Sequence, residues 1–173
     1  MPIRDLLRQD RRVRKLKRLI KSGNYSLPII EWQRELEAMY STRLTRRLTV
    51  GDVVRRFHRN FMQAVLQNQS NRSRAVEIKV HCVKTRNRLR KHTTELKRFL
   101  LARYSVQLRP IRTKAEREDM LNSVLFEADD CRQELDSLIE IIDLMVADMD
   151  STGRTVYNLV EMMKLLEQKG KQY

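Results

Sequence analysis

Apolar residues in the last third of the chain recur at alternating intervals of three and four. The series begins at Leu121 and ends at Leu166, and Thr152 is its only polar member. A repeat of about 3.5 residues gives a helix a continuous apolar seam that needs a partner helix along its length. The seam positions expected to make helix–helix interactions are Cys131, Leu135, Leu138, Ile142, Met145, Met149, Val156, Leu159, Met163 and Leu166.

Local signals predict the limits of this helix. Thr113 and Glu116 have the spacing of a capping box, which places the helix start near Lys114. The segment Asp150–Gly153 is the weak point, because it could end one helix and cap another. The seam keeps its phase across that segment, which favours a continuous or merely kinked helix.

The middle of this helix carries more apolar residues than a seam needs. Ile139, Ile141 and Leu144 widen the apolar stripe until little of the circumference stays polar. A helix that is apolar on most sides is normally buried. We therefore expect residues 135–146 to be deeply buried, in contact with more than one helix.

The basic first part of the chain predicts three or four helices. The first is expected from Met1 to Lys21 and is stopped by Gly23, and a short second helix is expected from Ser26 to Tyr40. Both carry apolar residues at helical spacing.

Two further helices are predicted after these. Thr49 and Asp52 form a second capping-box candidate, opening a helix that runs to about Gln69. Residues 74–104 form a long helix with a thinner apolar seam. The sequence leaves open whether the polar stretch 67–73 is a turn or part of one longer helix.

These elements predict an all-α protein, an elongated helical bundle with coiled-coil-like packing and a long C-terminal acidic heptad helix. We expect a basic helical region over residues 1–112. Residues 113–173 should form the acidic heptad helix, or a kinked helix pair, packed on that region. A chain of 173 residues can bury one sizeable core, so one cooperative domain is expected.

Charge is segregated along the chain. Residues 1–115 contain 30 Lys and Arg against 8 Asp and Glu, whereas residues 116–173 contain 6 against 14. These segments carry +22 and −8, which together give the net charge of +14. The acidic segment can pair with basic helices, but it cannot neutralise them. The excess must face solvent, counterions or a partner, and it suits a polyanion.

The basic residues concentrate on two predicted helices. Residues 74–104 would form a basic rod able to lie along phosphates, and residues 4–18 hold a second cluster. No zinc-finger spacing, basic-zipper layout or stacking platform is present, so binding to RNA or DNA should be led by the backbone and weakly sequence-specific. The expected polyanion-binding residues are Arg11, Arg12, Arg14, Lys15, Arg18, Lys84, Arg86, Arg88, Arg90, Lys91, Lys97 and Arg98.

Other interpretations of the basic surface stay open. It could be paired internally with the acidic helix, be an ordinary solvated face, or dock on an acidic protein. The amphipathic N-terminal helix could also lie on an anionic membrane, although it lacks bulky aromatic anchors. A helical protein partner or a second copy of the chain could cover the seam.

Catalytic chemistry finds little support in the sequence. None of the three histidines has a carboxylate or second ligand at a spacing that would preorganise a metal ion or a general base. The four glycines form no phosphate-binding loop. We expect no catalytic residue, metal, cofactor or small-molecule substrate, and interpret the chain as a non-catalytic adaptor or scaffold subunit of a larger assembly.

The same features predict an intracellular protein, either cytoplasmic or nuclear. No apolar run approaches the roughly 18 residues that span a bilayer, and residues 1–18 lack the apolar stretch of a signal peptide. Cys82 and Cys131 fall in different predicted helices, so two reduced, buried thiols are expected. The chain is therefore expected to be neither secreted nor transmembrane.

Overall fold

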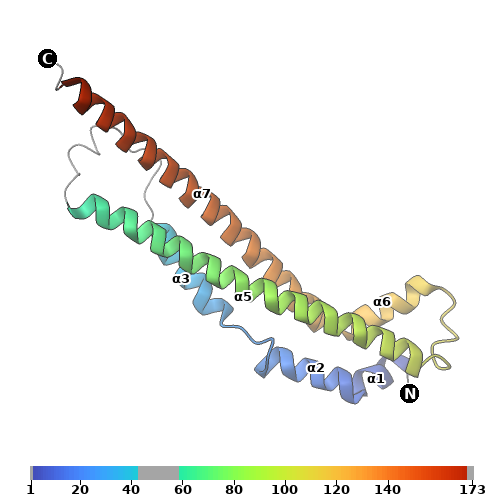
Figure 1. Ribbon diagram of the computed structural model, residues 1–173. Helices are drawn as coiled ribbons and strands as arrows, with labels where there is room; N and C mark the ends of the chain where they lie inside the picture. Colours follow the sequence, from blue (N-terminus) through green and yellow to red (C-terminus); the bar gives the residue numbers. More distant parts are fainter. Residues whose placement is uncertain (1, 43–58, 171–173) are drawn as a thin grey trace. The chain divides into compact units, whose positions relative to one another are not determined.

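The computed structural model describes residues 2–42 and 59–170, and every regular element within them is an α-helix (Figure 1). The prediction of an all-α protein is confirmed for these residues. The capping box expected at Thr49 and Asp52 lies outside them. The helices are α1 (Ile3–Gln9), α2 (Arg11–Ser22), α3 (Ile29–Ser41), α5 (Arg59–Arg103), α6 (Lys114–Val124) and α7 (Phe126–Gly170).

The chain forms two compact units, and the long helices α5 and α7 contribute to both. Unit 1 consists of Met1–Pro28 and Val80–Ile139, and unit 2 consists of Ile29–Lys79 and Glu140–Tyr173. Unit 1 therefore holds α1, α2, α6, the second half of α5 and the beginning of α7. All twelve residues expected to bind a polyanion belong to unit 1.

The apolar seam of α6 and α7 is buried. The sequence left open whether this chain, a second copy or another protein would cover the seam, and from Leu121 to Val156 a single chain covers it. Leu159 is half-buried, and the side chains of Met163 and Leu166 lie outside the described set. The buried seam positions are Leu121, Val124, Ala128, Cys131, Leu135, Leu138, Ile142, Met145, Met149, Thr152 and Val156.

Helix α5 buries a matching face. The polar stretch 67–73 is part of this helix, which answers the question that the sequence left open. Asn68 and Asn71 lie on the buried face, where the Asn68 amide nitrogen is 3.5 Å from the carbonyl oxygen of Met149 on α7. The buried positions of α5 also follow alternating intervals of three and four from Asn68 to Leu89: Asn68, Asn71, Ala75, Ile78, Cys82, Thr85 and Leu89.

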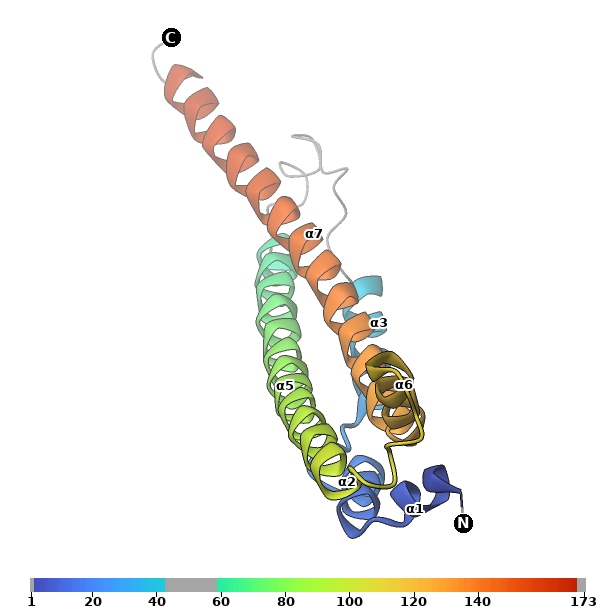
Figure 2. The same cartoon turned by 90° about the vertical axis from the view of Figure 1, so that its right-hand side faces the viewer.

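Ion pairs join α5 to α7 inside each unit, and they show that the two helices run antiparallel (Figures 1 and 2). Successive cations lie seven residues apart on α5, and their carboxylate partners lie seven residues apart in the reverse order on α7. The predicted internal pairing of basic and acidic helices is thus present at these positions. The pairs are Arg72–Asp150 and Lys79–Asp143 in unit 2 and Arg86–Asp136 in unit 1.

The N-terminal helix is interrupted, contrary to the expectation of one helix from Met1 to Lys21. Asp10 lies between α1 and α2 with ψ of 134°, outside the helical region, and its side chain caps α2. The predicted stop at Gly23 is confirmed, because α2 ends at Ser22. The break is marked by the preference of aspartate for the N-cap position and not by the spacing of apolar residues, so the apolar pattern alone did not predict it.

The acidic segment breaks at Leu125, where no break was expected, and continues through Asp150–Gly153, as the phase of the seam favoured. The capping box of Thr113 and Glu116 is present, and α6 begins at Lys114. However, α6 ends at Val124, and the neighbouring Leu125 is also buried. Leu125 has φ of −104° and ψ of 15°, outside the helical region, and its backbone N–H donates to the carbonyl oxygens of Leu121 and Asn122. The suspected weak point Asp150–Gly153 lies inside the continuous helix α7.

The expectation that residues 135–146 are buried on most sides is wrong. Ile139 is buried, but Ile141 is 48% exposed and Leu144 is 69% exposed. Leu144 lies about 200° around the helix axis from the fully buried Ile142, because each residue turns by about 100°. On this part of α7 the seam and Ile139 are buried, whereas Ile141 and Leu144 are not.

Adjacent isoleucines provide a matched test of the seam. Ile142→Ala should lower the free energy of unfolding by about 2–5 kcal/mol, because it leaves a cavity at a fully buried position. Ile141→Ala makes the same chemical change at a half-exposed position and should cost less than about 1 kcal/mol. Urea unfolding followed by circular dichroism measures both. Equal losses would contradict the assignment of Ile142 to the seam.

The continuity of α7 can be tested at Gly153. A Cβ atom added there would meet no neighbouring atom within 4 Å. Glycine inside a helix is less favourable than alanine by about 0.5–1 kcal/mol, so Gly153→Ala should stabilise unit 2 by that amount. Thermal unfolding measures the change. A loss of stability would mean that the chain needs a non-helical conformation at Gly153.

Candidate polyanion-binding surface

Polar contacts fix both ends of α2 to unit 1. The Asp10 carboxylate is 6% exposed, and one oxygen accepts a hydrogen bond from the backbone N–H of Arg12 at 2.8 Å. Its other oxygen accepts a hydrogen bond from the Tyr104 hydroxyl at 2.8 Å. Burial and this hydrogen bond raise the pKa of Tyr104, so the hydroxyl remains a donor at neutral pH. Beyond the other end, Tyr25 Oη lies 3.0 Å from His92 Nδ1.

Two cations of α2 are turned toward the rest of unit 1. The guanidinium of Arg12 lies 3.7 Å from the centroid of the Phe99 ring on α5, a cation–π contact. The Lys17 Nζ donates to Glu127 Oε1 on α7 at 3.0 Å. Because Val13 and Leu16 on the same helix are buried, α2 is held in a defined orientation.

The opposite side of α2 is purely cationic. Four exposed side chains lie there, at spacings of one, three, four and seven residues that place them on one side of the helix. The helix contains no Asp or Glu, and none of the four forms an ion pair with a described residue. We call Arg11, Arg14, Lys15 and Arg18 the outer α2 face.

The structure divides the basic residues of α5 into two groups. Arg86, Arg90 and Lys97 lie on the flank that meets α6 and α7. Arg86 donates to Asp136 at 2.9 Å, and Lys97 donates to the amide oxygen of Asn122 at 2.7 Å. These contacts leave this flank less available to an extended polyanion than the exposed side of the helix.

The second group on α5 faces away from the buried seam. Its four cations are exposed, and none of them forms an ion pair with a described residue. Glu95, which is also exposed, lies among them and lowers the net positive charge of this stripe. We call Lys84, Arg88, Lys91 and Arg98 the outer α5 stripe.

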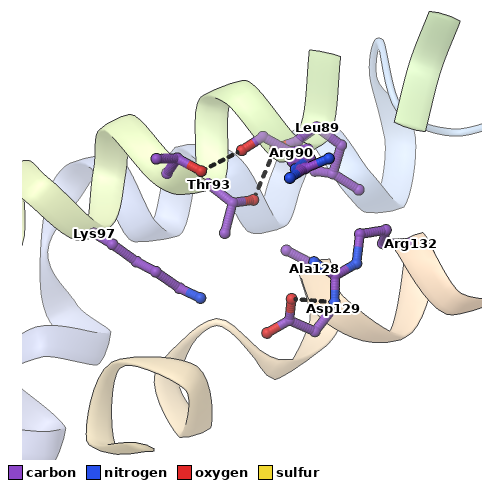
Figure 3. Close-up of a pocket in the computed structure, with 8 residues that line it drawn as sticks. Leu89, Arg90, Thr93, Lys97, Ala128, Asp129 and Arg132 are labelled. Carbon is purple, nitrogen blue, oxygen red and sulfur yellow. Dashed lines mark hydrogen bonds and ion pairs between the residues drawn. The ribbon is translucent and has the colours of Figure 1, made fainter. Parts of the chain in front are cut away.

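Arg90 and Lys97 line a recess between α5 and α7 inside unit 1 (Figure 3). Its volume is about 90 Å³, and the buried residues Leu89 and Ala128 form its apolar part. Sequence reasoning missed its third cation, Arg132 of α7. The signal was present in the sequence, since Arg132 is the only Lys or Arg among residues 118–150.

Asp129 and two threonines complete the lining of the recess. The Asp129 carboxylate lies 3.4 Å from the Arg132 guanidinium (Figure 3). The hydroxyls of Thr93 and Thr94 donate to the carbonyl oxygens of Leu89 and Arg90 on their own helix. The recess therefore contains three cations and one carboxylate.

The described residues contain no group of three or more His, Cys, Asp or Glu side chains that could hold a metal ion. Within the same residues, no helix combines the length and apolar character needed to cross a bilayer. Comparison of the chain with protein-family models, curated proteins and solved structures gave no match. Function is therefore inferred from the residues and their arrangement.

The two thiols should be unreactive in the folded protein. Both cysteines are buried, and burial raises the pKa of Cys82 to about 11 and also raises the pKa of Cys131. The reactive thiolate is consequently scarce at neutral pH. A disulfide-exchange reagent should modify neither thiol before denaturant is added and both afterwards. Ser105→Cys, at an exposed position, is the positive control. Rapid labelling of either thiol in the folded protein would contradict the burial of Cys82 and Cys131.

Proposed function

We propose that this chain is a non-catalytic helical adaptor or scaffold subunit that binds a nucleic-acid backbone through unit 1. The observation that carries the proposal is the outer α2 face, Arg11, Arg14, Lys15 and Arg18, on a helix without a carboxylate. Three of its four members are arginines, which match the geometry of phosphate oxygens. Contacts of this kind recognise the backbone and carry little sequence information.

The way α2 is held supports this proposal. Arg12 and Lys17 are already engaged with Phe99 and Glu127, so they help to orient the helix. A surface whose orientation is fixed before binding loses less conformational entropy when it binds. The outer α5 stripe adds cations at Lys84, Arg88, Lys91 and Arg98, and Glu95 makes it the weaker of the two surfaces.

We further propose that α5 and α7 pack as an antiparallel coiled-coil-like pair within each unit. Alternating buried positions on both helices support this, as do ion pairs that recur every seven residues. The acidic heptad helix would then act mainly as the partner that buries the seam of α5. Its carboxylates at Asp136 and Asp143 select the register, since exposed pairs add only about 0–1 kcal/mol each.

The second candidate is a protein-interaction module whose cationic surface docks on an acidic protein. The outer α2 face also supports this second candidate, because the four cations could bind a row of carboxylates on a partner protein in place of a row of phosphates. A membrane is less well supported. A helix that lies on a membrane needs an exposed apolar face to insert between the lipids. Here the apolar residues Leu7, Val13 and Leu16 are buried inside unit 1, so only the cationic side of α2 could contact lipid.

Neutralising the outer α2 face tests the proposed function. Changing its four cations to Gln should weaken binding to labelled RNA or duplex DNA by about tenfold or more in fluorescence anisotropy. The slope of log affinity against log salt should fall by about 3–4, because each phosphate contact contributes about 0.9. The residues changed are Arg11, Arg14, Lys15 and Arg18.

A matched control separates this surface from net charge. It removes four other exposed cations and should keep affinity within about threefold. Equal losses in the two variants would overturn the site assignment. If the parent protein shows no binding at about 50 mM salt, the nucleic-acid proposal fails and an acidic protein becomes the better candidate. The control substitutes Gln for Arg34, Arg109, Arg112 and Arg154.

A further inference from the structure

We propose that the recess between α5 and α7 in unit 1 binds a single phosphate group. The site is distinct from the outer α2 face, because its cations come from two helices and surround a cavity. Arg90 and Lys97 are on α5, and Arg132 is on α7 (Figure 3).

The charge balance of the recess favours an anion. Arg90 forms no ion pair with a described residue, and the partner of Lys97 is the neutral amide of Asn122 at 2.7 Å. Asp129 offsets one of the three positive charges through its contact with Arg132. Two positive charges therefore remain without a carboxylate, and a phosphate dianion would match them.

The size of the recess limits what it can hold. Its volume is about 90 Å³. Pockets for nucleosides and other drug-sized ligands are several times larger, about 300–1,000 Å³. A phosphate group fits this space, whereas the sugar or base attached to it would have to stay outside.

The lining strengthens the interaction with an anion. Leu89 and Ala128 are buried, and Thr93 is 7% exposed, so part of the recess is shielded from water. Charges in such a site are screened less by salt than charges on an open helix face. Arginine can also donate two parallel hydrogen bonds to one phosphate, which gives Arg90 and Arg132 directional roles.

Asp129 acts as an internal competitor for the bound phosphate. Its carboxylate now accepts the contact of Arg132 at 3.4 Å, and that guanidinium must be shared or released when phosphate enters. Removing the negative charge of Asp129 should therefore strengthen binding. A merely structural ion pair would not produce such a gain.

The phosphate could be free inorganic phosphate or the terminal phosphate of a nucleic-acid strand. A terminal phosphate as the ligand rests on the proposed function, whereas free inorganic phosphate as the ligand does not. Binding of inorganic phosphate alone would separate the two proposals. A preference for a 5′-phosphorylated oligonucleotide over its 5′-hydroxyl form would link them.

The test is an NMR titration of the full chain with inorganic phosphate at constant ionic strength. Saturable shifts should cluster at the backbone amides around residues 89–97 and 128–132. Arg90→Gln and Lys97→Gln should each weaken binding by about tenfold or more, and Asp129→Asn should strengthen it several-fold. Arg109→Gln and Arg112→Gln remove charge from exposed positions of unit 1 outside the recess and should change affinity less than about twofold.

Two results would overturn the proposal. One is the absence of saturable shifts at the recess, and the other is an equal loss in the recess variants and in the Arg109 and Arg112 controls. The substitutions lie at exposed or half-exposed positions, so circular dichroism should show unchanged helicity. The same variants, titrated with phosphorylated and unphosphorylated oligonucleotides, distinguish a terminal-phosphate site from one for the free ion.

Discussion

Burial of the seam between α5 and α7 is the constraint on which the other features depend. Each helix presents apolar or small polar residues at alternating intervals of three and four, and neither could remain in water with that face exposed. Fully burying one leucine or isoleucine contributes about 1.5–3 kcal/mol, more than an exposed ion pair. Leu89, Leu135 and Ile142 therefore provide stability, while the charged residues beside them influence register.

The seam also decides which cations stay available. A residue on α5 next to the seam meets α7, and there Arg86 finds Asp136. A residue on the opposite side, such as Lys91, meets no carboxylate of α7 because the helix itself lies between them. The same packing that buries the core thus divides the basic residues of α5 into a flank that faces α6 and α7 and a stripe whose cations form no ion pair with a described residue. Within the part of the chain that the structure describes, the cations of this stripe are exposed.

Local signals in the sequence predicted local features well. The capping box at Thr113 and Glu116 needs only neighbouring residues, and the seam from Leu121 to Val156 needs only the helical period. Both could be predicted because each depends only on residues that are close together in the sequence. The stop at Gly23 belongs to the same class.

Features that depend on which helix packs against a residue in the folded protein could not be predicted. The exposure of Leu144 reflects the absence of a described helix on that side of α7, and apolar composition carries no record of this. The break at Leu125 was not predicted, because the buried seam positions Leu121, Val124 and Ala128 keep their spacing across it. The recess could not be foreseen either, because Arg90 and Arg132 lie far apart in sequence and meet only through antiparallel packing.

The outer α2 face and the recess represent two different uses of positive charge. The outer face is open to solvent, so the attraction for a polyanion that we propose there would be long-ranged, salt-sensitive and tolerant of geometry. The recess is small and partly apolar, so it should select one group by size and hydrogen bonding. Together, the two proposals would let unit 1 attract a nucleic acid along α2 and distinguish a terminal phosphate from an internal one. Both surfaces need the same packed core, because α2 is anchored on α5 and α7 through Phe99 and Glu127, and the recess exists only where those two helices meet.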